Sequence, residues 1–320
     1  MLAAPSIHSE LIPVSVATLT LSSVIGIDFY LCTGGNDRPM LFCASADPME
    51  LCKIQRLLTD GMTKLYIHSN DRQLYQTYLR ENCKSILANE HQPVEARMNV
   101  MSEVIRDVLK QQFAVGTTQT IVDTCQTFGK STVALLGREP VVLKDLVRVL
   151  HHDYGTFTHS ANVSAFSVML GKSLGFSFED LEQIAVGGLL HDLGKLEISD
   201  RILNKPGKLD ENEMREIRKH PVMGLQRVAD RVDLSMGQMM MIYQHHERNN
   251  GSGYPVGCHG HEIHPWARMC AIVDVYEALT AQRPYRQALS IQTALAVLER
   301  GRGTEYDEEM LECWQKLVTA

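Results

Sequence analysis

The chain has 320 residues, of which 44% are hydrophobic and 22% are charged, so it is long enough for two domains with a sizeable core. Its formal net charge of −7 argues against a protein that coats a nucleic-acid polymer, because such binding requires a basic face. A small anionic substrate held by a few local cations is compatible with this charge.

The sequence also argues against a membrane or secreted protein. No segment approaches the roughly 20 apolar residues that a membrane-spanning helix requires. The first basic residue is Arg38, whereas a secretory signal needs an earlier one. The eight cysteines are scattered without C-x-x-C spacing, which predicts reduced thiols and a cytoplasmic location.

The first half of the chain predicts two segments of different kinds. Residues 1–68 predict a small α/β regulatory module. We expect, in chain order, two strands within 12–32, a turn at 34–37, a strand at 39–44, a helix over 51–58 and a strand at 63–68. Residues 69–148 carry long helical patterns with few breakers, and we interpret them as a helical connector that is a candidate for homodimerisation.

Residues 149–320 predict an all-helical domain that is rich in histidine, since ten of the thirteen histidines lie between 151 and 264. Ser177 and Asp210 predict helix starts, because each is followed three residues later by an acid that completes a capping pattern. A methionine-rich helix is expected over 234–247 and another over 266–281, after Pro265. The predicted fold class is therefore mostly α, with a small α/β module at the N-terminal end.

Two pairs of polar residues stand out against the apolar helices of this domain. His191 and Asp192 end an apolar helix, and His245 and His246 stand side by side before a glycine-rich loop. Asp274 interrupts a third apolar run. A single histidine on a helix is usually an ordinary core or surface residue, but buried charges are costly unless they are paired or metal-bound.

Metal coordination explains these residue types together. Imidazole and carboxylate suit iron, manganese or zinc, and the absence of nearby cysteines argues against a structural zinc site. Asp192 has two oxygens and can bridge two ions. Adjacent helical residues point about 100° apart, so His245 and His246 can approach a two-metal cluster from different directions. Such a cluster can clamp the attacking and leaving oxygens of a phosphoryl displacement.

Four motifs in order resemble the HD-GYP family of bacterial phosphodiesterases, a branch of the HD superfamily, over about residues 150 to 300. They are His191-Asp192-Leu193-Gly194-Lys195, then Ile202-Leu203-Asn204-Lys205-Pro206-Gly207-Lys208-Leu209 with His220-Pro221 and Gly224, then His245-His246-Glu247-Arg248 through Gly251-Ser252-Gly253-Tyr254-Pro255, and finally Asp274-Val275-Tyr276-Glu277-Ala278-Leu279-Thr280 with Arg283-Pro284-Tyr285-Arg286.

The resemblance implies a helical domain that hydrolyses cyclic di-GMP to linear pGpG or GMP, with a metal-bridging hydroxide as nucleophile. Matched position by position, the implied metal ligands are His159, His191, Asp192, His220, His245, His246 and Asp274. Lys195 resembles the family's catalytic lysine, which steadies charge on the scissile phosphate. Arg283 and Arg286 resemble residues that hold substrate phosphates, and the Gly253-Tyr254-Pro255 turn shapes the wall of the pocket.

This sequence departs from the family at three places. Asn249-Asn250 stands where relatives usually carry Trp-Asp or a similar pair, and Glu277 stands where Asp is usual. Some relatives hold a third metal with a glutamate at the position of Gly155, which has no side chain. Asp153 stands two residues before this position, which is about 200° around a helix, so its carboxylate should face away from the metal site. We therefore expect two divalent ions, iron or manganese, and pGpG as the product.

Two other functions are compatible with the same residues. The first is a binding or signalling module with an intact metal site and negligible turnover, which could act on other signalling proteins. The second is a phosphodiesterase for another cyclic dinucleotide. The His-His pair and the Gly-Tyr-Pro turn argue against a simpler one-metal HD enzyme. An assay of cyclic di-GMP turnover by the iron- or manganese-loaded protein would distinguish these functions.

Overall fold

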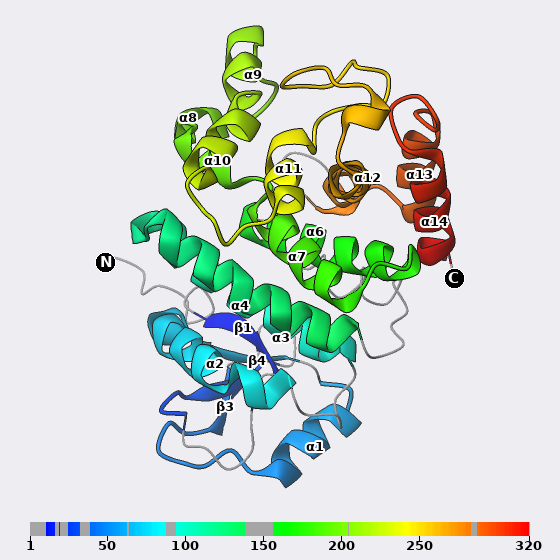
Figure 1. Ribbon diagram of the computed structural model, residues 1–320. Coiled ribbons are helices and arrows are strands. Elements are labelled where there is room, and N and C mark those ends of the chain that lie inside the picture. Colours follow the sequence, from blue (N-terminus) through cyan, green and yellow to red (C-terminus); the bar gives the residue numbers. More distant parts are fainter. Residues whose placement is uncertain are drawn as a thin grey trace. The chain divides into compact units, whose positions relative to one another are not determined.

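The computed structural model describes residues 11–16, 19, 25–32, 39–62, 64–87, 94–137, 156–203, 205–282 and 287–319 (Figure 1). The chain divides into two compact units, Met1–Val104 and Ile105–Ala320. None of the described helices is long and apolar enough to cross a membrane.

The first unit contains a four-stranded antiparallel sheet with the strand order β1-β4-β2-β3. Its elements are β1 (Leu11–Ser15), β2 (Phe29–Leu31), β3 (Met40–Cys43), α1 (Leu51–Thr59), β4 (Lys64–His68), the short 3-10 turn η3 (Ser69–Asp71) and α2 (Arg72–Leu87). Val14, Phe29, Leu65 and Ile67 are buried and form part of its core. The expected strands and helix are confirmed, while the expected turn at 34–37 lies outside the described residues.

The second unit is helical, apart from two isolated β-bridges among its described residues. Its elements are α4 (Thr118–Leu136), α6 (Thr156–Ser173), α7 (Phe178–Leu190), η4 (Leu193–Glu197), α8 (Asp200–Leu203), α9 (Glu211–Ile217), α10 (His220–Val228), α11 (Met236–Gln244), η5 (Gly260–Glu262), α12 (Pro265–Thr280), α13 (Ile291–Glu299) and α14 (Glu308–Thr319). Helix α3 (Val94–Val115) contains the division between the units. The predicted fold class is confirmed.

Local capping signals in the sequence locate several helix ends correctly. The Ser177 side chain accepts a hydrogen bond from the backbone of Asp180 at the start of α7, and Asp210 forms a capping box with Glu213 at the start of α9. The helix expected over 266–281 is present as α12, which begins one residue earlier, at Pro265, and ends at Thr280. The methionine-rich helix is shorter than predicted, because Ser235 caps its first turn and the helix ends at Gln244.

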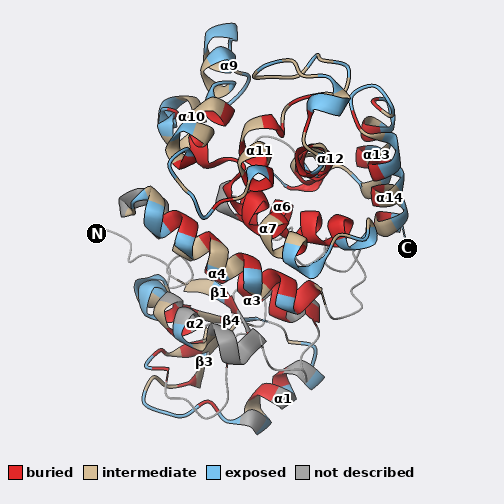
Figure 2. Cartoon of the chain, viewed as in Figure 1, coloured by how far each residue is buried: buried red, intermediate tan, exposed pale blue. Residues whose placement is uncertain are grey.

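Helix α12 lies at the centre of the helical unit and packs against α6, α11, α13 and α14 (Figure 1). Most residues of α12 are buried, and the helix is coloured largely red in Figure 2. The rings of Phe166, Tyr276 and Trp314 pack together with centroid separations of 5.0–6.1 Å, which anchors α12 to its neighbours. A central helix therefore carries Asp274 and Glu277 in the interior, where charged groups require partners.

Candidate metal centre

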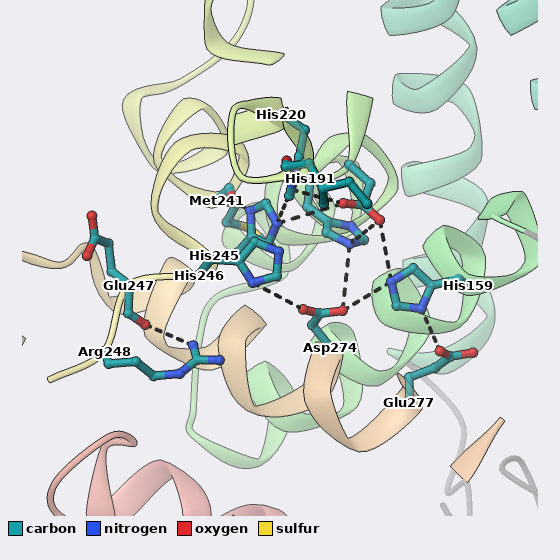
Figure 3. A network of polar contacts seen from close by, with 12 residues as sticks. His159, His191, His220, Met241, His245, His246, Glu247, Arg248, Asp274 and Glu277 are labelled. Carbon is teal, nitrogen blue, oxygen red and sulfur yellow. Dashed lines mark hydrogen bonds and ion pairs between the residues drawn. The ribbon is translucent and has the colours of Figure 1, made fainter. Parts of the chain in front are cut away.

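Five histidines and two aspartates from separate helices meet inside the second unit (Figure 3). They are His159 on α6, His191 at the end of α7, Asp192 at the start of η4, His220 at the start of α10, His245 and His246 at the end of α11, and Asp274 on α12. All seven residues that the sequence singles out as metal ligands therefore lie in one cluster. Most of the seven residues lie at helix ends. Where the chain leaves a helix, consecutive side chains can point in different directions.

The two oxygens of Asp192 face different groups of histidines. Its Oδ1 lies 3.3 Å from His220 Nε2 and 3.8 Å from His245 Nε2. Its Oδ2 lies 3.3 Å from His191 Nε2 and 3.6 Å from His159 Nε2. Two sets of possible ligand atoms consequently share this carboxylate: Asp192, His220, His245 and His246 in one, and His159, His191 and Asp192 in the other.

Asp274 approaches the same cluster from α12. Its Oδ1 is 3.1 Å from His159 Nε2, and its Oδ2 is 4.0 Å from His246 Nδ1. The two aspartates thus place carboxylate oxygens among all five imidazoles. Carboxylate and imidazole ligands together suit iron, manganese and zinc.

Backbone carbonyl groups determine which nitrogen of three histidines carries the proton. The Nδ1 atom of His191 donates to Gly188 O at 2.8 Å, that of His220 to Ile217 O at 2.7 Å, and that of His245 to Met241 O at 3.0 Å. A carbonyl oxygen can only accept, so Nδ1 must be protonated in each ring. The Nε2 atom of each neutral ring therefore carries a free lone pair that faces the cluster.

The lone pairs face one another in a way that favours a cation between them. His220 Nε2 and His245 Nε2 are 3.1 Å apart, although neither has a proton to share in the neutral state. His191 Nε2 is buried and makes no hydrogen bond within the described part of the chain. Buried acceptors that converge without a donor are costly unless an ion coordinates them. The residues present thus fit bound metal ions.

Protonation of these imidazoles is disfavoured by their surroundings. Burial lowers the pKa of His220 to about 4 and that of His246 to about 3. Burial also lowers the pKa of His245 well below its ordinary value, and the neighbouring imidazole of His246 adds to this effect. The three rings are therefore neutral near pH 7, the form that binds metal.

The carboxylates of the cluster are held in their charged form. Burial opposes ionisation of Asp192, but the charge of the Lys195 ammonium holds its pKa well below the ordinary value. Burial likewise opposes ionisation of Asp274, but the hydrogen bond and charge of His159 keep its pKa well below the ordinary value. Two buried carboxylates that stay ionised beside the neutral rings of His220, His245 and His246 form a site that attracts cations.

Lys195 reaches the cluster from the turn that follows Asp192. Its Nζ lies 2.5 Å from Asp192 Oδ2, and its side chain is partly exposed. The three-residue spacing within η4 places both side chains on one face of the turn. The ammonium group is therefore positioned between the buried carboxylate and the solvent.

The Gly-Tyr-Pro turn is held against the cluster by Glu247. The buried Glu247 side chain points away from the histidines in Figure 3 and accepts backbone N–H groups of Val256, Gly257 and Cys258 at 2.7–3.1 Å. The Tyr254 ring stacks on His246 with centroids 4.7 Å apart. Tyr254 thus forms one wall of the site.

Most of the second unit lies within a segment that matches a known family. The HD domain family matches residues 83–310, which is more than half of the chain. The chain belongs to the HD domain family. The expected resemblance to its HD-GYP branch is confirmed, with the HD signature at His191 and Asp192.

Several curated proteins are similar to this HD domain protein over 163–181 residues. A cyclic di-GMP phosphodiesterase of Pseudomonas aeruginosa is 35% identical over 181 residues, which are 57% of this chain and 44% of that protein. The cyclic di-GMP phosphodiesterase response regulator RpfG of Xanthomonas campestris is 36% identical over 178 residues, 55% of this chain and 47% of that protein. A 3′3′-cGAMP-specific phosphodiesterase 3 of Vibrio cholerae is 36% identical over 163 residues, 51% of this chain and 35% of that protein. The chain thus spans about half the length, or less, of these relatives.

A solved structure shares the architecture of the chain. It is an HDG"Y"P protein from Bdellovibrio bacteriovorus, with a TM-score of 0.66 and 20% identity, and the match covers 97% of this chain and 100% of that one. At this identity the likeness concerns the fold. It agrees with an all-helical HD domain that follows a small α/β module.

Some site residues of the HD domain were not assigned a role by sequence reasoning, and some predicted residues are not described. Arg283 and Arg286 lie outside the described residues, as do Gly155 and Asp153. The sequence marks Glu277 only as a departure from the family pattern, yet its carboxylate contacts His159. Its position three residues after Asp274, on the same face of an apolar helix, is a signal that would have indicated this contact.

Gly194 allows the two ligand-bearing turns of the HD domain to touch. A Cβ atom at Gly194 would overlap the carbonyl oxygen of His220 and lie 2.5 Å from the backbone nitrogen of Gly224. Gly194→Ala is therefore expected to displace α10 and His220, with a loss of about 1–3 kcal/mol of unfolding free energy and weaker metal binding. Thermal unfolding and metal titration would measure both effects.

Gly171→Ala is the matched control. Gly171 is buried in α6, and an added Cβ would meet only the end of the Leu181 side chain, at 2.9 Å, with Ile184 next at 3.4 Å. That side chain can rotate, so metal binding should be unchanged. Normal metal affinity in Gly194→Ala would contradict the close approach of η4 to α10.

Proposed function

We propose that the chain is a metal-dependent phosphodiesterase that hydrolyses cyclic di-GMP to pGpG. The observation that carries this proposal is the shared carboxylate of Asp192, whose two oxygens face different histidine groups. This arrangement suits two ions that act on one phosphate. The names of the relatives from Pseudomonas aeruginosa and Xanthomonas campestris support the substrate.

We assign the metal ligands to one list of side chains: His159, His191, Asp192, His220, His245, His246 and Asp274. The ions that we propose are iron or manganese. When bound, a pair of divalent ions supplies Lewis acidity and an activated water for attack on phosphorus. Nδ1 contacts with the backbone keep the lone pairs of three histidines directed inward, so this part of the site is pre-organised.

Other side chains act on the substrate in this proposal. The Lys195 ammonium stabilises the charge that builds on the scissile phosphate. The Gly253-Tyr254-Pro255 turn closes the pocket beside His246, where the Tyr254 ring is already stacked. Arg283 and Arg286 bind phosphate oxygens, for which the guanidinium fork is suited.

Turnover of defined cyclic dinucleotides tests this function directly. The protein is purified anaerobically with iron or manganese and incubated with cyclic di-GMP or 3′3′-cGAMP, and products are separated by chromatography. We expect cyclic di-GMP to be converted to pGpG, and metal-depleted protein to be inactive. Preference for 3′3′-cGAMP would identify a different cyclic dinucleotide as the substrate, and binding without turnover would indicate a signalling module.

We expect two metal ions per chain and accumulation of pGpG. The seven assigned side chains provide about four protein contacts per ion when Asp192 is shared, and open positions remain for substrate. A third ion would need another carboxylate, and position 155 is a glycine. Elemental analysis of anaerobically purified protein checks the number of ions. Three ions per chain, or GMP as the main product, would contradict this expectation.

We also propose roles for the rest of the chain. Residues 1–68 act as a regulatory module, and residues 69–148 act as a connector that supports homodimerisation. We place the protein in the cytoplasm, where its cysteines stay reduced. Residues 149–320 carry the catalytic domain in this proposal.

A further inference from the structure

His159 differs from the other buried histidines in the partner of its Nδ1 atom. His191, His220 and His245 donate Nδ1–H to backbone carbonyls three or four residues earlier in the chain. His159 Nδ1 instead lies 2.5 Å from Glu277 Oε2, a carboxylate on α12 that is 118 residues away in sequence (Figure 3). A charged acceptor makes a stronger hydrogen bond than a carbonyl does.

Glu277 is fixed on both of its oxygens by one face of α6. Its Oε1 accepts a hydrogen bond from Asn162 Nδ2 at 3.0 Å, and Asn162 follows His159 by three residues. The Glu277 side chain is 1% exposed. Because Asp274 lies one helical turn earlier, with Oδ1 3.1 Å from His159 Nε2, α12 contacts both nitrogens of the same ring.

We propose that Glu277 is a positioning residue for metal binding at His159. It holds the proton on Nδ1 and fixes the ring, so that Nε2 offers its lone pair to the ion beside Asp192 and Asp274. The longer side chain of glutamate provides the reach that places Oε2 on His159 while Oε1 stays on Asn162. The proposal rests on the metal site of the proposed function and predicts that only one of two ions depends on Glu277.

Metal titration of Glu277→Gln tests this role, because glutamine keeps the size and an acceptor oxygen but removes the charge. Metal-free protein is titrated with Mn²⁺ and followed by calorimetry and electron paramagnetic resonance. We expect one of two affinities to fall about 10–100-fold while the other is unchanged, as for outer partners of ligand histidines. Glu277→Asp should lower the same affinity through lost reach, and Glu179→Gln, an exposed acid on α7, should change neither.

A double-mutant cycle separates positioning from a general structural effect. In a His159→Ala background, Glu277→Gln should have little further effect on Mn²⁺ affinity, because the group through which it acts is gone. An equal loss in both backgrounds, or no loss in the single variant, overturns the proposal. Wild-type protein that binds no Mn²⁺ would overturn the metal site itself, whereas two bound ions without cyclic di-GMP turnover would refute only the proposed activity.

A second feature is an arginine held over Tyr254 at the edge of the cluster. The Arg218 guanidinium carbon lies 5.5 Å from the Tyr254 ring centroid, and the same ring stacks on His246. Arg218 forms no ion pair within the described part of the chain. Its neighbour Lys219, in contrast, pairs with Glu216 at 2.6 Å.

We infer that Arg218 binds the second phosphate of a cyclic dinucleotide, the one that is not cleaved. A guanidinium stacked on a ring keeps its N–H donors available at its edge, and little side-chain freedom is lost when it binds an anion. An exposed cation that has no counter-charge among the described residues, beside a phosphodiesterase site, is suited to a dianionic substrate. This inference rests on the proposed function.

Comparison of two substrates tests the inference. Arg218→Ala should raise KM for cyclic di-GMP by about tenfold or more, the value of one charge-assisted hydrogen bond. It should leave kcat/KM for bis(p-nitrophenyl) phosphate unchanged, because that substrate has one phosphate. Lys219→Ala, which removes a neighbouring charge that is already paired, should alter neither. Equal effects on both substrates, or none, overturn the inference, whereas wild-type protein that hydrolyses only the synthetic ester refutes the proposed substrate.

Discussion

Asp192→Ala is expected to remove bound metal and activity together. Asp192 is the only carboxylate among the described residues that lies within 4 Å of His159, His191, His220 and His245. Loss of an outer partner of a metal ligand costs about 10–100-fold in affinity or activity, so loss of a shared ligand should cost more than that. Elemental analysis should find less than the full metal content, and cyclic di-GMP turnover should fall by more than about 100-fold.

His191→Ala should have the same two effects through the loss of a single Nε2 donor. Two control variants remove the same residue types elsewhere: His261→Ala, on an exposed turn, and Asp230→Ala, on an exposed helix end. Both controls should keep wild-type metal content and turnover. If Asp192→Ala or His191→Ala kept full metal and turnover, the assignment of this cluster as the catalytic centre would be wrong.

The sequence predicted those parts of the fold that depend on contacts between residues close together in the sequence. Ser177 and Asp210 start helices because their side chains bond the backbone two or three residues later, and this signal is complete within one turn. The end of α11 was misplaced for a related reason. The helix was expected to reach Glu247, but it ends at Gln244 and the Glu247 carboxylate binds backbone groups at 256–258, a long-range contact that local periodicity does not reveal.

The metal cluster was predicted from motifs, whereas its supporting contacts were not. His159 and Glu277 are separated by 118 residues, so their contact depends on how α6 packs against α12. The backbone carbonyls that hold His191, His220 and His245 carry no sequence signal, because every residue has one. Residue types therefore indicated the chemistry, and only the packed helices show how each ring is oriented.

Lys195→Ala is expected to keep the metals but to lose most of the rate. The Lys195 ammonium is partly exposed and contacts Asp192 Oδ2 at 2.5 Å, a position from which it would also reach a phosphate bound at the cluster. Removal of one pre-organised donor of this type costs about 10²–10³-fold in kcat. Single-turnover rates with cyclic di-GMP would measure the loss, and metal analysis of the same samples would show whether the ions stay.

Metal content decides between two roles for this lysine. The same ammonium lowers the pKa of Asp192, so its removal weakens one of the groups that keep that carboxylate ionised. A bound divalent ion would keep Asp192 ionised far more strongly than the lysine does, so metal should be retained. Lys205→Ala, which removes a lysine paired with Glu213 at 2.5 Å, serves as the control and should keep both metal and rate. If Lys195→Ala lost its metals, the role of Lys195 would be to stabilise the metal ligand Asp192. If kcat were unchanged, Lys195 would have no catalytic role.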